Sequence, residues 1–245
     1  EYESINATIE ETIVENNKIN FSIFIDEIQK QYVERINIIG NNITREDVLR
    51  NKLILDEGDA FNKILHAKSI NELKALNFFN SVNVEVVEGS SENSKIINID
   101  VEEKATGEIS AGAGFGTSGS TIGFAVKENN FLGRGIQFST NLELSDESIR
   151  GMFSVVNPNF KGTDQSVFTT IQSSETNRLS DFGYKTTKTG FTLGSRFEYY
   201  EKMFISPSVT TYYESLKTDS SASSILEKQK GTYFDTDLNY LIDYD

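Results

Sequence analysis

The chain has 245 residues, a formal net charge of −14 and no cysteine. That length allows two ordinary domains. The missing thiols exclude disulfide scaffolds, thiolate metal sites and cysteine nucleophiles. The acidic balance argues against nucleic acid as a partner, because phosphate binding requires a basic face. No apolar run reaches 18 residues, so no transmembrane helix is predicted.

Residues 31–105 have the pattern of a small α+β domain. Residues 32–40 alternate as a strand does, and Asn41 and Asn42 then break the pattern. A helical stripe follows within residues 65–76. Alternating segments at residues 82–86 and 97–101 complete the order β-α-α-β-β. The core predicted from these patterns consists of Ile36, Ile38, Leu49, Leu65, Leu73, Leu76, Val84, Ile97 and Ile99.

The start of the first helix is marked by four residues. Thr44 with Asp47 three residues later resembles a capping box, and Ile43 with Val48 occupies the positions of a hydrophobic staple. These signals predict a helix from about residue 45 to residue 53. The polar segment 56–59 then interrupts the helical pattern.

The first 30 residues repeat part of this domain. Residues 21, 23, 25, 26 and 27 correspond in kind to residues 97, 99, 101, 102 and 103, at a constant offset of 76. We therefore interpret residues 1–30 as the end of a preceding copy of the module, with a chance match as the alternative. The chain begins without Met and stops inside an alternating segment, which we interpret as an excerpt of a longer protein.

Residues 106–245 alternate with period two nearly throughout. Phe124, Phe138 and Leu142 share one face, whereas Gln137 and Asn141 share the other. Segments of roughly ten residues with one polar face favour a transmembrane β-barrel over a soluble sandwich, whose strands are shorter. About eight segments are predicted, and they begin near Gly107, Ser120, Gly135, Glu147, Asp164, Gly183, Met203 and Gly231.

Enzyme chemistry is not predicted. Residues 114–119 spell G-x-G-x-x-G, but a strand follows where a dinucleotide site needs a helix. The only histidine, His66, has no neighbour at metal spacing and is expected on a helix surface. No nucleophile has a positioned partner. We therefore expect no catalytic residue, no metal and no cofactor.

In several blocks the chain resembles the outer-membrane protein assembly factors of the BamA family. Residues 32–41, 48–50, 57–58, 73–79, 82 and 101–104 are similar to the last POTRA module of that family. Residues 112–117, 128–135 and 157–160 are similar to the start of its barrel and to two of its periplasmic turns. These blocks occur in the family's order along essentially the whole chain.

The resemblance implies an α+β POTRA domain followed by the N-terminal half, about eight of about 16 strands, of an antiparallel transmembrane β-barrel. It implies the bacterial outer membrane, with the POTRA domain in the periplasm, and a function in folding and inserting β-barrel proteins. The implied partners are the lipoproteins of the BAM complex, unfolded outer-membrane protein clients and outer-membrane lipid. A TamA-like or two-partner-secretion translocation pore is the alternative, and a passive porin is disfavoured by the module.

The first barrel strand is the expected lateral gate. Glycine weakens a strand by roughly 0.5–1 kcal/mol per residue, and an opened edge can pair with an incoming strand. The alternative is that the glycines only let the strand pass a crowded lumen. Gly107 is the expected hinge, and Glu57 matches the family's acidic contact to a lipoprotein, with a solvated loop carboxylate as its alternative. The gate residues are Ile109, Ser110, Ala111, Gly112, Ala113, Gly114, Phe115 and Gly116.

Overall fold

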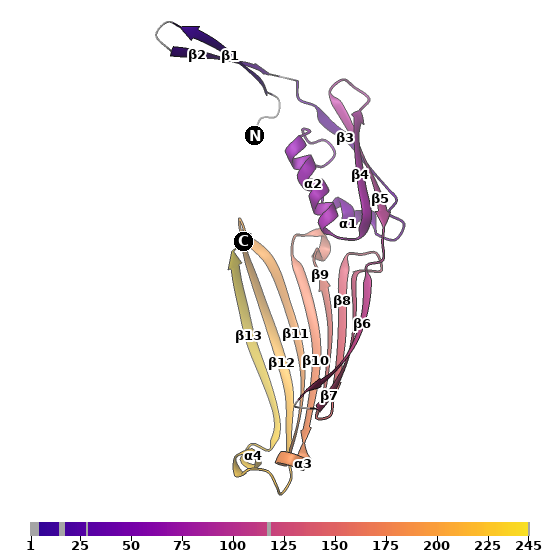
Figure 1. The fold of residues 1–245 in the computed structure, drawn as a ribbon, viewed down its shortest axis with the longest axis vertical. Helices are drawn as coiled ribbons and strands as arrows, with labels where there is room; N and C mark the ends of the chain where they lie inside the picture. The colour runs from indigo at the N-terminus through magenta and orange to yellow at the C-terminus, as the bar shows by residue number, and fades with distance from the viewer. Residues whose placement is uncertain (1–4, 15–17, 28, 117–118, 245) are drawn as a thin grey trace. The chain divides into compact units, whose positions relative to one another are not determined.

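A computed structural model describes the chain except for residues 1–4, 15–17, 28, 117–118 and 245 (Figure 1). The chain divides into two compact units, Glu1–Lys104 and Ala105–Asp245. Each unit is described by itself. Among the described residues, no helix is long and apolar enough to cross a membrane.

The first unit contains a three-stranded sheet with two helices on one face. The strand order is β3-β5-β4, with β3 parallel and β4 antiparallel to the central strand. Leu49 of α1 and Leu73 of α2 are fully buried against Ile97 and Ile99 of β5. The expected order β-α-α-β-β is confirmed (Figure 1). The elements are β3 (Tyr32–Ile39), α1 (Glu46–Arg50), α2 (Lys63–Ala75), β4 (Phe79–Glu88) and β5 (Ser94–Glu103).

Most of the predicted core is confirmed. Leu65 is the exception: it lies in the first turn of α2, partly exposed and outside the buried cluster. Its backbone N–H is instead capped by the side chain of Asn62 at 2.9 Å. The prediction missed four members of the cluster. Three of them lie at the ends of elements, where a short pattern has no period, whereas Val101 continues the alternation of Ile97 and Ile99. These four are Val33, Phe78, Phe79 and Val101.

The predicted capping box and staple are wrong. The helix begins at Glu46 after Arg45, which makes no side-chain cap, and it ends at Arg50. Thr44 is buried and donates to the carboxylate of Glu103, through its N–H at 2.6 Å and through its hydroxyl. Ile43 is exposed and its N–H donates to the same carboxylate at 2.8 Å. A residue distant in sequence thus replaces the local cap.

The hydrogen bonds to Glu103 also set its charge state. Partial burial raises the pKa of this carboxyl, but the bonds from Thr44 and Ile43 outweigh burial and leave the pKa below its usual value. The carboxylate form therefore holds the loop before α1 against the last residue of β5. Glu34, on β3, also has a lowered pKa, because its carboxylate accepts hydrogen bonds from the N–H of Ser90 and the hydroxyl of Ser94.

A separate hairpin precedes the module. Its strands β1 (Ile5–Val14) and β2 (Lys18–Glu27) are antiparallel, with Ile9 opposite Ile23. Those two side chains are exposed on a largely apolar face. Strand β2 lies 76 residues before β5 at both ends. The interpretation of residues 1–30 as the end of a preceding module stays a prediction.

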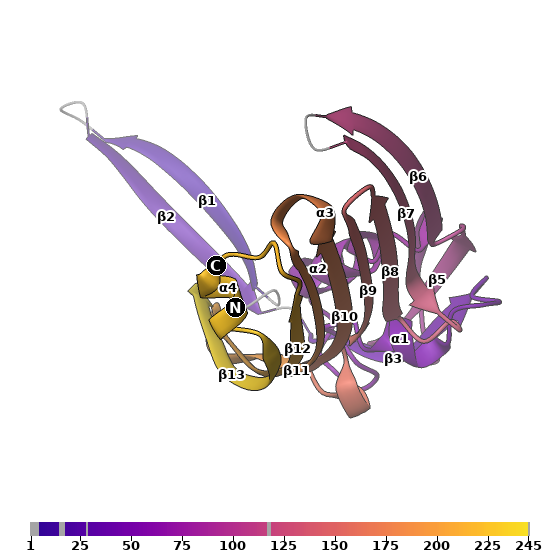
Figure 2. The same cartoon turned by 90° about the horizontal axis from the view of Figure 1, so that it is seen from below.

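The second unit is one antiparallel sheet of eight strands, in the sequential order β6 to β13. The strands follow an open arc with β6 and β13 at its ends (Figure 2). Each strand starts within two residues of its predicted start, which confirms the period-two analysis. The strands are β6 (Gly107–Gly116), β7 (Gly119–Phe131), β8 (Ile136–Ser145), β9 (Ser148–Asn157), β10 (Ser166–Arg178), β11 (Tyr184–Tyr200), β12 (Met203–Thr218) and β13 (Gly231–Tyr244).

Short elements fill three of the connections. They are η1 (Phe160–Gly162), α3 (Leu179–Phe182) and α4 (Ser224–Lys228). We call the end of the sheet where β6 begins the near end, and the opposite end the far end. The predicted turn at residues 129–135 lies at the near end, where Gly133 and Gly135 have φ of 67° and 65°. The side chain of Asn130 accepts the N–H of Gly135 at 2.8 Å and closes this turn.

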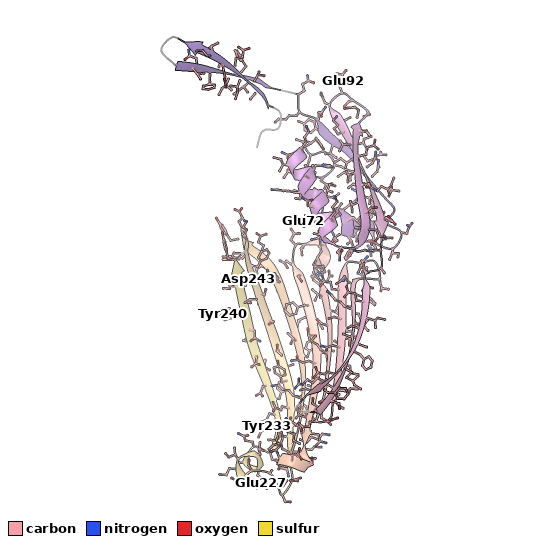
Figure 3. All side chains as sticks on the ribbon, viewed as in Figure 1. Glu72, Glu92, Glu227, Tyr233, Tyr240 and Asp243 are labelled. Carbon is pink, nitrogen blue, oxygen red and sulfur yellow. The ribbon has the colours of Figure 1, made fainter. Side chains whose placement is uncertain are left out.

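The sheet has an apolar face and a polar face. Phe124 of β7 pairs in register with Leu142 of β8, so both project from the apolar face together with Phe138. Gln137 and Asn141 project from the polar face. On β13, Tyr233 lies toward the far end and Tyr240 toward the near end (Figure 3). The predicted register is confirmed.

We expect residues 31–105, expressed alone, to fold as a soluble domain. Leu73→Ala should lower the free energy of unfolding by about 2–5 kcal/mol, because it removes a fully buried side chain. Ile64→Ala, on the exposed side of the same helix, should change it by about 0.5 kcal/mol at most. Urea titrations followed by circular dichroism measure both. A random-coil spectrum of the unsubstituted domain would contradict the expectation.

The same domain should lose stability in acid through Glu103. Its lowered pKa stabilises the fold above the usual glutamate pKa of about 4.3, and this contribution disappears as the pH falls through the lower folded value. Glu103→Gln should therefore be less stable than the parent domain at pH 7, and the difference should shrink below about pH 4. Glu34 remains in both proteins, so some acid sensitivity persists. A difference independent of pH would show that the charge of Glu103 does not hold the loop.

The two faces should differ sharply in their tolerance of charge. In the complete protein folded into bilayers, Phe138→Arg should cost about 2–4 kcal/mol if the residue lies near the midplane of the membrane, because this side chain projects from the apolar face. Gln137→Arg should cost much less. Denaturant titration in bilayers compares the two variants, and equal losses would mean that the polar and apolar faces are assigned wrongly.

Candidate functional site

The candidate site is strand β6 and the connection that precedes it. Among the described residues β6 pairs only with β7, from Gly107 opposite Glu128 to Gly116 opposite Gly119. All ten of its residues are exposed, and Ile109 and Phe115 are 85% and 91% exposed. Its outer edge therefore carries backbone N–H and C=O groups that no described strand pairs.

Most side chains of β6 are small, and Glu108, Ile109 and Phe115 are the exceptions. Its pairing with β7 places Gly112, Gly114 and Gly116 on the polar face, and Ile109 and Phe115 on the apolar face. A Cβ added at any of the three glycines would meet no atom within 4 Å. No crowding among the described residues therefore requires these glycines. The eight predicted gate residues all lie on this one strand.

A carboxylate holds the beginning of β6. Glu128 of β7 accepts a short hydrogen bond from the Thr106 hydroxyl and one from the Asn130 N–H at 2.7 Å. The backbone and side-chain N–H groups of Asn129 both donate to the carbonyl of Thr106 at 3.3 Å. A Cβ on Gly107 would lie 2.9 Å from Glu128 Oε2. The role of Gly107 as a hinge stays a prediction. In the structure Gly107 lies opposite Glu128.

Glu57 lies beside the outer edge of β3, where the backbone of the following residues Gly58 and Asp59 pairs with Val33. Its Oε1 accepts the N–H of Ile36 at 3.0 Å and lies 3.6 Å from Arg50. The Arg50 guanidinium also donates to the carbonyl of Ile36 at 3.0 Å. Glu57 therefore has a role within the module that its sequence neighbours do not reveal, since Ile36 is 21 residues away. Its side chain remains 43% exposed, and the contact to a partner stays a prediction.

The residue types that bind metals lie apart from one another in the described part of the chain. Within the described ranges, no three His, Asp or Glu side chains are placed to hold a metal ion. His66 is partly buried beside the ring of Phe61 at 5.7 Å, which corrects its expected place on the helix surface. Burial lowers the pKa of His66, so the imidazole is neutral at pH 7.

Two family models match the chain. Residues 31–104 match POTRA, described as a surface antigen variable number repeat, and residues 130–245 match the Omp85 superfamily domain. These ranges cover the three-stranded module and most of the eight-stranded sheet.

Curated relatives match the same region. A candidate outer membrane protein assembly factor of Treponema pallidum is 31% identical over 136 residues, which are 53% of this chain and 16% of that protein. The outer membrane protein assembly factor BamA of Neisseria meningitidis serogroup B is 26% identical over 148 residues, which are 60% of this chain and 19% of that protein. The chain thus spans less than a fifth of these relatives.

Solved structures have the same fold. BamA from Haemophilus ducreyi lacking POTRA domains 1–3 aligns with a TM-score of 0.72 at 20% identity, over 99% of this chain and 48% of that one. CdiB from Escherichia coli aligns with a TM-score of 0.60 at 12% identity, over 100% of this chain and 47% of that one. Figure 1 accordingly shows a POTRA module and a half-barrel. Together with the family matches and the relatives, this places the sheet in the bacterial outer membrane and the module in the periplasm: the chain combines a POTRA domain with an Omp85 superfamily domain that has the fold of the N-terminal half of an outer-membrane β-barrel.

Proposed function

We propose that this chain is part of an outer-membrane insertase, which folds and inserts β-barrel proteins by pairing their strands with the edge of β6. The observation that carries the proposal is the composition of β6, whose side chains are small over most of its length and which has Gly112, Gly114 and Gly116 on one face. The names of the BamA relatives and the likeness to a BamA structure support the assembly role.

Strand addition has a large driving force in this setting. Each backbone polar group left unpaired in hydrocarbon costs several kcal/mol, so an open barrel edge is unstable until a strand pairs with it. A client strand has the same unpaired groups. Pairing satisfies both edges through the main chain, which makes addition largely independent of client sequence. This suits a factor that accepts many clients.

The clamp at the near end gives the strand one fixed end. Thr106 and Asn130 converge on Glu128, so the first residues of β6 are tied to β7. The three glycines lie toward the far end, where each weakens the strand. We therefore expect the far half of β6 to separate and re-pair more readily than Gly107 and Glu108.

The module provides a place for partners. Under this proposal Glu57, with its side chain partly exposed at the edge of β3, contacts a lipoprotein of the BAM complex, while unfolded outer-membrane proteins and lipid meet the barrel. Because Oε1 is engaged by Ile36 and Arg50, the partner would approach the other oxygen. No catalytic residue takes part in this function.

Disulfide trapping tests the pairing. The 245 residues contain no cysteine, so single cysteines at positions 110–115 of the full-length protein report without background from this region. With cysteines along the last strand of a stalled client, we expect crosslinks whose partner advances by one residue for each step along β6. A disulfide requires Cα atoms within about 7 Å, so the pattern reads the register directly.

Cysteines at Gln137 and Asn141, on the polar face of β8, serve as the control. A client that pairs with β6 should crosslink poorly at these positions. Crosslinks to Gln137 and Asn141 alone would mean that the client passes through the barrel, and the translocation-pore alternative would then replace the insertase.

A further inference from the structure

Five charged and polar side chains form a row across the polar face of the half-barrel. The strand registers place Glu143 opposite Arg150, Arg150 opposite Ser174, Ser174 opposite Lys188, and Lys188 opposite Glu214. The row therefore runs Glu, Arg, Ser, Lys, Glu over five consecutive strands, β8 to β12. Its two positive charges face each other across Ser174, and its negative charges lie at the outer ends.

The two cations are only loosely engaged by their glutamates. Arg150 lies 3.7 Å from Glu143, and Lys188 lies 3.6 Å from Glu214. Within the part of the chain that the structure describes, neither head group makes a side-chain hydrogen bond of 3.5 Å or less, and neither does the Ser174 hydroxyl. Charge-assisted hydrogen bonds are normally 2.7–2.9 Å long. The donors of Arg150 and Lys188 are thus available to a better acceptor.

A hollow of about 310 Å³ lies over the middle of this row. Arg150, Ser174 and Lys188 line it together with Glu143, and Met152 and Tyr212 contribute apolar surface. Tyr212 also positions the lysine, since the ammonium lies 4.1 Å from the centre of its ring. Arg150 and Lys188 stand two strands apart, which is about 10 Å between their backbones. Long side chains can close that gap around one small anion.

We propose that this hollow binds a carboxylate, held between Arg150 and Lys188 over the Ser174 hydroxyl, and that the carboxylate belongs to an acidic side chain of a polypeptide segment inside the barrel. The inference extends beyond strand addition and does not depend on it. The Arg150 guanidinium can donate two parallel hydrogen bonds to the two carboxylate oxygens. The Lys188 ammonium adds a compact positive charge, and the Ser174 hydroxyl is a further donor.

The exposure of the site argues for a tethered occupant. The side chains of Arg150 and Lys188 are 63% and 44% exposed, so water screens their charges and a free anion would bind weakly. A carboxylate on a segment already inside the barrel has a high effective concentration, which compensates for weak intrinsic binding. The segment can belong to the full-length protein outside residues 1–245 or to a client, and the two sources are separable by experiment.

Carbodiimide coupling in the full-length protein in bilayers identifies the carboxylate. The reagent activates a carboxylate, the Lys188 amine displaces the activating group as a urea, and an amide joins the two side chains. Glu214→Gln removes the neighbouring carboxylate that would otherwise react. Lys188→Arg keeps the charge but has no amine to couple, so it is the matched control. Mass spectrometry then locates the residue joined to Lys188.

Inorganic phosphate tests the same donors when the hollow is vacant. Phosphate at constant ionic strength should raise the unfolding temperature of the full-length protein. Its apparent Kd should weaken by roughly tenfold or more in Arg150→Gln/Lys188→Gln, as expected for the loss of charge-assisted bonds. Lys127→Gln, which removes an exposed lysine of the polar face outside the row, should leave phosphate binding unchanged.

The outcomes separate as follows. An amide from Lys188 to an acidic residue of the full-length protein outside residues 1–245 supports the proposal with an internal segment, and one that forms only after addition of an unfolded client supports it with the client. Phosphate binding that needs Arg150 and Lys188 supports the chemistry of the site. Absence of both the amide and this phosphate effect overturns the proposal, and it leaves the cysteine crosslinks of β6 unaffected.

Discussion

Backbone hydrogen bonding in a bilayer is the constraint on which this half-barrel depends. In hydrocarbon no water can pair an exposed N–H or C=O group, so strands are held by their neighbours along their whole length. Strands β7 to β12 have a described neighbour on both sides, whereas β6 has one. Under the proposed function, the same requirement drives a client strand to pair with β6, which its three glycines weaken. A factor that works by strand pairing needs no other chemistry.

Where strands cannot provide partners, carboxylates do so. Glu57 accepts the N–H of Ile36 at the edge of β3, Glu103 accepts two N–H groups before α1, and Glu128 accepts one beside the start of β6. Each is an acceptor with two oxygens and no donor, so it satisfies backbone groups that point away from the sheet. Part of the acidity of the chain is therefore structural, and it concentrates at the ends of elements.

The local patterns of the sequence predict the strands well and the connections poorly. The alternation of apolar and polar residues predicts all eight strand starts within two residues, because successive side chains of a strand project to opposite faces and only one face is apolar. The predicted helix cap is wrong because the Thr44 hydroxyl donates to Glu103, 59 residues away, and does not cap α1. The clamp at Glu128 and the row through Arg150, Ser174 and Lys188 depend on strand register, which a single segment does not specify.

The row of charged and polar side chains on the polar face gives way to glycines toward the edge strand β6. Beyond Glu143 the registers continue it through Gly123 of β7 to Gly112 of β6, and an added Cβ at either glycine would meet no atom within 4 Å. A strand that joins β6 at this level meets bare backbone on the polar face, and the first charge, that of Glu143 on β8, is three strands away. Selection at the edge therefore rests on main-chain hydrogen bonds and on the apolar face. If both proposals hold, recognition of charge is left to the middle of the sheet, so one surface accepts clients of varied sequence while another remains selective.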